Sequence, residues 1–133
     1  MRLLDTNVIL RWLLDDDAEQ SRAANKFIQR AFHEKQKLLI SDLTVAELVW
    51  VMEGKEMIPE AVTHLLRAAL EDHRLEFENR ERLLAALAWY SAHEVDFIDA
   101  YQAALVQEKK LEAVVSFDRD FSRLPVQWEI PEK

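Results

Sequence analysis

Short apolar runs alternate along the chain with longer stretches in which apolar residues recur every three or four positions. The short runs, typical of strands, cover residues 2–5, 37–40, 74–77 and 112–117. The longer stretches predict helices over residues 7–14, 18–34, 43–52, 59–72, 80–93 and 97–110, with a short helix near Phe121 and an edge strand over 126–130. Because this alternation is expected of a parallel sheet covered by helices, the sequence predicts an α/β fold.

Several residues indicate where these helices begin and end. Thr6 is placed to cap the first helix, and Pro59 falls in the first turn of the fourth, where proline is tolerated. Gly54 is expected to stop the third helix, while Lys109 and Lys110 complement the carbonyl end of the sixth. With one glycine and three prolines there is no flexible linker, so we expect a single domain over residues 1–133.

Composition narrows the class of protein. Half of the 133 residues are apolar, yet the longest unbroken apolar stretch, residues 83–90, is far shorter than the roughly 20 residues that span a bilayer, so no membrane segment is expected. An acidic residue at position 5 interrupts any secretory leader, and there is no cysteine, which together favour a cytoplasmic protein. The formal charge of −8 repels nucleic acid, so any nucleic-acid partner must be met by local basic residues or through metal ions, and the charge equally suits a basic partner protein.

Four acidic residues lie in or beside apolar segments, far apart in the sequence. They are Asp5, Glu47, Asp99 and Asp118. An unpaired charge is costly to bury, and acids gathered in one place must be relieved by protonation or by a bound cation. Hard oxygen ligands select Mg²⁺ or Mn²⁺. The hypothesis is therefore a metal site.

The first two of these acids each have an alternative reading. Asp5 follows a strand, at the edge where open α/β sheets bind ligands, but aspartate there also serves as a helix N-cap. Glu47 lies in a segment that is apolar nearly all round, which predicts a buried helix and a partner for the glutamate. That partner would be either a metal ion or an arginine.

Near Asp99 and at Asp118, a helix cap is again an alternative to a functional role. Asp96 and Asp99 are three residues apart on one helix face, where Asp96 is the better N-cap and Asp99 the better functional carboxylate. Asp118 ends the most strand-like run, with Ser116 and Asp120 alternating around it, and it too has a capping alternative. Two strand ends of one parallel sheet would bring Asp5 and Asp118 to the same rim.

Other residue types give weaker signals. The histidines show no ligand spacing and receive no role, and the tryptophans read as core or interface because a base-stacking platform needs basic residues among the aromatics. No phosphate-binding loop, dinucleotide-binding glycine motif or cysteine nucleophile is present. Several basic residues are candidates for phosphate contacts but are also ordinary surface residues, and are left outside the site: Arg11, Lys35, Lys37, Arg119 and Arg123.

Four segments together resemble a known family. Residues 3–10 (LLDTNVIL), 41–48 (SDLTVAEL), 96–100 (DFIDA) and 114–121 (VVSFDRDF) look like the four acidic motifs of PIN-domain proteins, in the family's order. The whole set is similar to the VapC-type toxin ribonucleases. The resemblance implies a three-layer α/β/α sandwich around a central, mostly parallel sheet of four or five short strands.

The resemblance also implies an activity. It is that of an endoribonuclease dependent on Mg²⁺ or Mn²⁺, acting as the toxin of a VapBC-type toxin–antitoxin pair, neutralised by a cognate VapB-like antitoxin and homodimeric. Catalytic and metal-binding roles fall on Asp5, Glu47, Asp99 and Asp118, with Asn7 and Ser116 in supporting positions. Asp96 adds an acid to the third motif, as ligand or as cap.

Two other functions remain open on the sequence. Residues 5–8 (DTNV) partly resemble the nucleophile motif of haloacid-dehalogenase-like phosphatases, although Asn7 replaces the second acid and Glu47 is left without a role. Alternatively, a catalytically silent PIN-fold module would bind RNA or protein through its acidic pocket.

Overall fold

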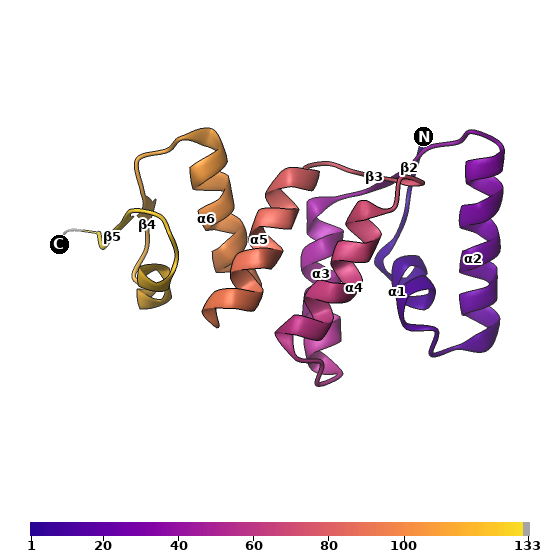
Figure 1. Ribbon diagram of the computed structural model, residues 1–133, viewed down its shortest axis with the longest axis horizontal. Helices are drawn as coiled ribbons and strands as arrows, with labels where there is room; N and C mark the ends of the chain where they lie inside the picture. The colour runs from indigo at the N-terminus through magenta and orange to yellow at the C-terminus, as the bar shows by residue number, and fades with distance from the viewer. Residues whose placement is uncertain (132–133) are drawn as a thin grey trace. The chain divides into compact units, whose positions relative to one another are not determined.

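The computed structural model describes residues 1–131 and divides the chain into two units (Figure 1). The first unit is Met1–Arg80, and the second begins at Glu81. Each unit has its own sheet and its own helices, and each is described separately below.

The first unit contains a three-stranded parallel sheet. Its strands β1 (Arg2–Leu3), β2 (Leu38–Ile40) and β3 (Leu75–Phe77) pair in the order β1-β2-β3. Leu38 of β2 is in register with Arg2 on one side and with Leu75 on the other. The connections carry four helices, α1 (Thr6–Leu14), α2 (Ala18–His33), α3 (Asp42–Gly54) and α4 (Pro59–Glu71). This strand–helix alternation confirms the α/β prediction for this part of the chain.

The side chains that start these helices are short and polar, with one exception. Asp17 caps α2 by accepting a hydrogen bond from the Gln20 N–H, and Ser41 caps α3 by accepting from the Thr44 N–H. Pro59 opens α4, as predicted. The prediction of Thr6 as the first cap was wrong by one position: Asp5 is the cap, and α1 begins at Thr6.

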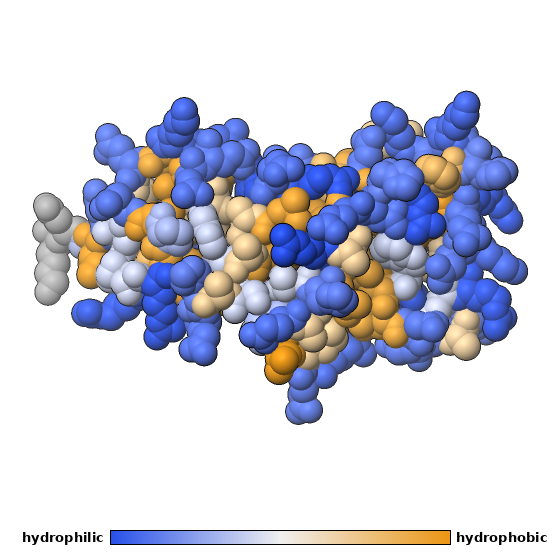
Figure 2. Space-filling view, in the orientation of Figure 1, coloured by the Kyte–Doolittle hydropathy of each residue, from blue (hydrophilic) through white to orange (hydrophobic). Residues whose placement is uncertain are grey.

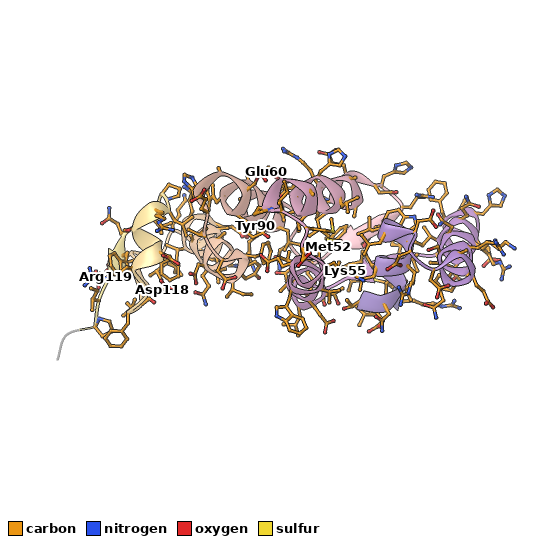
Figure 3. All side chains as sticks on the ribbon, turned by 90° about the horizontal axis from the view of Figure 1, so that it is seen from below. Met52, Lys55, Glu60, Tyr90, Asp118 and Arg119 are labelled. Carbon is orange, nitrogen blue, oxygen red and sulfur yellow. The ribbon has the colours of Figure 1, made fainter. Side chains whose placement is uncertain are left out.

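The core of the first unit is aliphatic and closed to solvent. Helix α1 packs on α2 and α3, and α3 packs on α4. Met52 of α3 is fully buried, whereas Lys55, just past the end of the helix, pairs with Asp16 at 3.6 Å (Figure 3). The remaining fully buried side chains include Ile9, Ile28, Leu38, Ile40, Val45, Leu48, Val62, Leu66, Leu70 and Leu75.

The second unit pairs two helices with a small parallel sheet. It comprises α5 (Arg80–His93), α6 (Phe97–Lys109), β4 (Val114–Val115), the 3-10 helix η1 (Arg119–Arg123) and β5 (Trp128–Glu129). Val114 of β4 is in register with Trp128 of β5, so the predicted edge strand is present. Helix α6 contacts both β4 and η1. The segments that follow α6 are therefore held against its flank.

Specific side-chain contacts fix α5 to α6. The rings of Tyr90 and Phe97 meet edge to face at 6.0 Å, and both residues are buried. Arg82 of α5 donates to Glu108 at 2.7 Å and to the Tyr101 hydroxyl at 2.9 Å, both on α6. These contacts set the position of α6, the helix that carries Asp99.

The strands within residues 1–131 form a three-stranded and a two-stranded sheet, with pairing found inside each unit. All three strand pairs are parallel, as the sequence predicts. None of the helices described in residues 1–131 is long and apolar enough to cross a membrane.

Candidate metal centre and active site

Asp5 lies two residues after the end of β1, where the backbone leaves the sheet and enters α1. One carboxylate oxygen, Oδ2, accepts a hydrogen bond from the Asn7 N–H at 3.2 Å. The residue is exposed, and within residues 1–131 its other oxygen has no hydrogen-bond partner. Asp5 is thus a helix cap that still offers an oxygen for binding, so its two readings are compatible.

Glu47 is held by a neighbour of Asp5. The Thr6 hydroxyl, itself buried, donates a short hydrogen bond to Oε1 of Glu47, joining α1 to the middle of α3. Because Thr6 follows Asp5 in the chain, both acids lie at the carboxyl edge of the first unit's sheet. The arginine partner considered for Glu47 is not found in the described part of the chain, since a hydroxyl takes that place.

The expected burial of Glu47 was wrong. Leu43, Glu47 and Trp50 follow one another at i, i+4 and i+7 on a single face of α3, and all three are exposed. Leu43 is 81% exposed and Trp50 is 74% exposed. The opposite face, with Val45, is buried. Since both faces of this helix are apolar, sequence periodicity could not tell which one enters the core.

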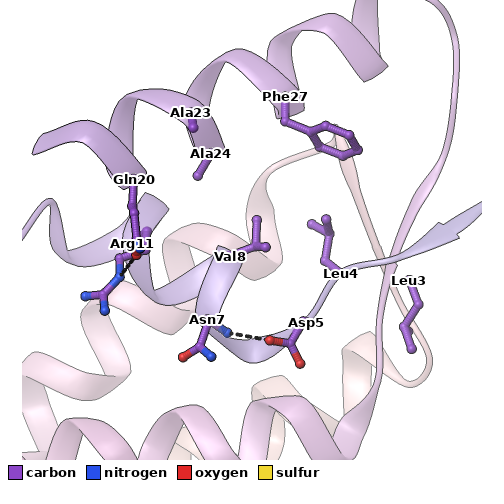
Figure 4. Close-up of a pocket in the computed structure, with 10 residues that line it drawn as sticks. All are labelled: Leu3, Leu4, Asp5, Asn7, Val8, Arg11, Gln20, Ala23, Ala24 and Phe27. Atoms are coloured by element: carbon purple, nitrogen blue, oxygen red, sulfur yellow. Dashed lines mark hydrogen bonds between the residues drawn. The ribbon is translucent and has the colours of Figure 1, made fainter. Parts of the chain in front are cut away.

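A pocket lies beside Asp5, lined by residues of β1, α1 and α2 (Figure 4). It has a volume of about 520 Å³, and Asp5 and Asn7 stand at one side of it. Arg11 lies near one end, where its guanidinium is engaged by Gln20 at 2.6 Å and Asp16 at 2.9 Å. The floor of the pocket is largely apolar and includes Leu4, Val8, Ala24 and Phe27.

The second unit brings three carboxylates together. Asp99 stands in the first turn of α6, Asp118 is the N-cap of η1, and Asp120 follows in the first turn of η1. Each offers one oxygen, and these three oxygens lie within 4.8 Å of one another. Figure 3 shows Asp118 beside Arg119, where the chain enters η1.

Local hydrogen bonds fix the loop that carries two of these acids. The Ser116 hydroxyl accepts from the Asp118 N–H at 2.9 Å, and Asp118 Oδ1 accepts from the Asp120 N–H at 2.9 Å. The Ser116 carbonyl in turn accepts from the Trp128 indole at 2.9 Å. Ser116 thus contacts Asp118 directly, and its supporting role in catalysis stays a prediction.

The electrostatics of the cluster are unfavourable without a cation. Partial burial, followed by the hydrogen bond and the negative charge of Asp118, raises the pKa of Asp99 from 3.8 to about 6. The charges of Asp96 and Asp120 act in the same direction. Three carboxylates and no nitrogen or sulfur ligand form a donor set that fits Mg²⁺ or Mn²⁺ and not a softer metal.

The roles of Asp96 and Asp120 differ from the expectation. Asp96 occupies the N-cap position of α6 but makes no capping hydrogen bond with its side chain, and it lies outside the three-carboxylate cluster. Asp120 belongs to the cluster although it was not among the predicted site residues. The alternation of Ser116, Asp118 and Asp120 in the sequence was the available signal, but in the structure the turn into η1 places Asp120 beside Asp118.

Comparison with known proteins identifies the family of the chain. The PIN domain family model matches residues 2–127, and the chain belongs to the PIN-domain family. It is 26% identical over 125 residues to a VapC ribonuclease of Aquifex aeolicus (strain VF5), covering 93% of this chain and 92% of that protein. The match therefore includes both units and every acid discussed above.

Proposed function

We propose that this protein is a metal-dependent endoribonuclease of the VapC type, which hydrolyses RNA phosphodiester bonds with Mg²⁺ or Mn²⁺. The observation that carries the proposal is the cluster of Asp99, Asp118 and Asp120 in a chain of the PIN-domain family. A related protein of similar length is named a ribonuclease, which supports RNA as the substrate.

We further propose that Asp5, Glu47, Asp99 and Asp118 take part in one reaction, with residues 1–133 working as a single domain. The family match supports this because it runs from residue 2 to residue 127 without dividing at the boundary between the units. Asn7 supports Asp5 through its backbone N–H, and Ser116 supports Asp118 through its hydroxyl.

The residues would divide the chemistry as follows. Asp99, Asp118 and Asp120, with the remaining oxygen of Asp5, would hold the cation. When bound, the ion supplies charge neutralisation at the phosphate and a more acidic water. Glu47, oriented by the Thr6 hydroxyl, would accept the proton of the attacking water. Because the pKa of Asp99 is raised to about 6, this carboxylate is ionised and ready to bind above that pH.

The biological setting proposed is that of a cytoplasmic toxin, homodimeric and held inactive by a VapB-like antitoxin. The name of the related ribonuclease supports the pairing. An acidic chain with a formal charge of −8 suits a basic partner, and a segment lying in the pocket beside Asp5 would cover that acid.

Membership of the PIN-domain family weighs against the phosphatase alternative, which also gives Glu47 no task although Thr6 orients it. The silent binding module remains the competing proposal, because it keeps the same fold and acids. Cleavage separates the two.

The test is a gel assay of the purified protein on total transfer RNA, with Mn²⁺ or with EDTA, beside Asp99→Asn. Discrete fragments from the wild-type protein with Mn²⁺, absent with EDTA and in the variant, are expected. Equal cleavage by Asp99→Asn would remove the proposed mechanism. A folded wild-type protein that binds Mn²⁺ but cuts no RNA would favour the silent module.

A further inference from the structure

A basic surface lies in the first unit, at the edge of the sheet opposite Asp5. Lys37 immediately precedes β2 and Arg74 immediately precedes β3, so both stand at the amino ends of parallel strands. Asp5 follows the carboxyl end of β1. A three-residue strand spans about 10 Å, which separates this surface from the residues assigned to cleavage.

This basic surface contains a cavity that is lined by basic side chains. A cavity of about 550 Å³ is bounded by the end of α2 and the start of β2 on one side and by residues 73–76 on the other. Lys35, Lys37 and Arg74 line it, against a single acid, Glu76. An adjacent hollow of about 350 Å³ adds Lys26 and Arg30, together with one further acid, Glu34. In a chain with a formal charge of −8, this concentration of positive charge is a local exception.

The two lysines are available to a ligand. Lys35 is exposed and forms no ion pair within residues 1–131, and it occupies the left-handed turn after α2, where its φ is 57°. Lys37 pairs with Glu76 at 3.3 Å, but both side chains are well exposed, so water and salt weaken that pair. Arg74 is already engaged by Asp72 at 2.7 Å, which offsets its charge, so the positive charge offered to a ligand comes from Lys35 and Lys37.

Two aromatic rings lie in the same cavity. Phe32, in the last turn of α2, is 49% exposed and meets the ring of His73 edge to face at 5.5 Å. An edge-to-face contact leaves each ring at least one face that its partner does not cover. Exposed rings among cations are the combination that holds single-stranded nucleic acid, where bases stack on the rings and phosphates meet the cations. The surrounding surface over α2 is mostly hydrophilic (Figure 2).

We propose that this surface, defined by Phe32, Lys35, Lys37 and His73, binds a single-stranded segment of RNA. This proposal rests on the proposed function, in which RNA is the substrate. It adds that a single-stranded part of the RNA is bound at a distance from the cleavage site. Phosphates contact Lys35 and Lys37, and a base stacks on the Phe32–His73 pair. An acidic peptide would use the lysines alone and leave the exposed Phe32 without a partner, which is why RNA is favoured.

The test is fluorescence anisotropy of a labelled single-stranded RNA of about 12 nucleotides, within the usual range of site sizes. It is performed in EDTA, where the acidic cluster holds no ion and no cleavage occurs. The variants are Lys35→Gln/Lys37→Gln and Phe32→Leu. The matched control is Lys109→Gln/Lys110→Gln, which removes the same charge, again with one lysine at positive φ, from the end of α6. Circular dichroism checks that all variants are folded.

Removal of two phosphate contacts should lower the slope of log affinity against log salt by roughly 1.4, from about 0.7 per contact. Phe32→Leu should weaken binding roughly 5- to 150-fold, the effect of losing one stacked base. The control should bind like the wild-type protein.

Three results would overturn the proposal. The control variant could lose as much RNA affinity as the lysine variant, the Phe32 and lysine variants could bind RNA like the wild-type protein, or duplex RNA could bind as tightly as single-stranded RNA. If the changes abolish capture of an antitoxin while RNA binding is intact, the surface is a protein interface and the proposal also fails. The outcome is separate from that of the proposed function. Loss of RNA binding in the patch variants, with no cleavage by any protein, would refute the nuclease and keep the RNA surface.

Discussion

Asp99→Asn should increase the stability of the metal-free protein and weaken its binding of metal. In the folded protein the pKa of Asp99 is raised from 3.8 to about 6, chiefly by partial burial and by Asp118. Between those two values the folded state therefore binds more protons than the unfolded state, and stability falls as pH rises through this window. Above about pH 6 the loss is complete and constant. Asparagine carries no charge, so the variant should not show this loss.

The size of the effect follows from the same shift. A shift of this size corresponds to about 3 kcal/mol at 1.36 kcal/mol per unit. Asp99 is only partly buried, so solvent screening reduces this figure, and we expect about 1 kcal/mol. For a chain of this length that is a change in Tm of roughly 3–5 °C. In EDTA at pH 7.5, Asp99→Asn should thus be more stable than the wild-type protein by about this amount.

With Mn²⁺ bound, the wild-type protein should become more stable than Asp99→Asn. Mn²⁺ at about one hundred times its Kd stabilises the protein that binds it by roughly 2.7 kcal/mol, and Asp99→Asn should gain little of this. The assay is urea unfolding followed by tryptophan fluorescence, at pH 4 and pH 7.5, with EDTA or Mn²⁺. At pH 4 in EDTA the two proteins should nearly coincide. The reasoning is refuted if Asp99→Asn is the less stable protein in EDTA at pH 7.5, or if the difference is independent of pH.

Substitutions at Asp5, Thr6 and Asp120 separate structural from chemical roles. Asp5→Asn should abolish cleavage but keep the α1 cap, so its stability should change by less than about 0.5 kcal/mol. Asp5→Ala should abolish cleavage and also destabilise the protein by about 1 kcal/mol, because the cap is lost. Thermal unfolding and the gel assay test both variants. Thr6→Val should lower kcat roughly tenfold by releasing Glu47, with RNA affinity unchanged by anisotropy. Asp120→Asn should weaken Mn²⁺ binding in calorimetry about tenfold, and more than Asp96→Asn, which alters an acid outside the cluster.

The bounds of several helices were predictable from the sequence. Helix α5 has the bounds expected, and α2 and α4 end within one residue of the prediction, because their periodicity and end residues agree. Helix α3 shows the limit of this approach. Its faces through Val45 and through Leu43 are both apolar, so the buried one is chosen by tertiary packing and not by the local sequence.

The site was predictable as a set of acids but not as a geometry. Asp99 and Asp118 were expected together and are adjacent, while Asp120 joined them through a local turn whose spacing alone did not reveal its direction. The link between Thr6 and Glu47 spans 41 residues, and no sequence periodicity encodes a contact of that range. The cap at Asp5 was foreseen as an alternative to function, and the structure shows that the capping bond uses Oδ2 alone.

The most direct test of the central claim is calorimetric titration of Mn²⁺ into the wild-type protein, Asp5→Asn and Asp99→Asn. If the acids of both units hold the same ion, each substitution should weaken Mn²⁺ binding, and Asp5→Asn should do so with its helix cap intact. Binding by Asp5→Asn at wild-type affinity, with Asp99→Asn alone impaired, would show that Asp5 takes no part in the site and would contradict the account.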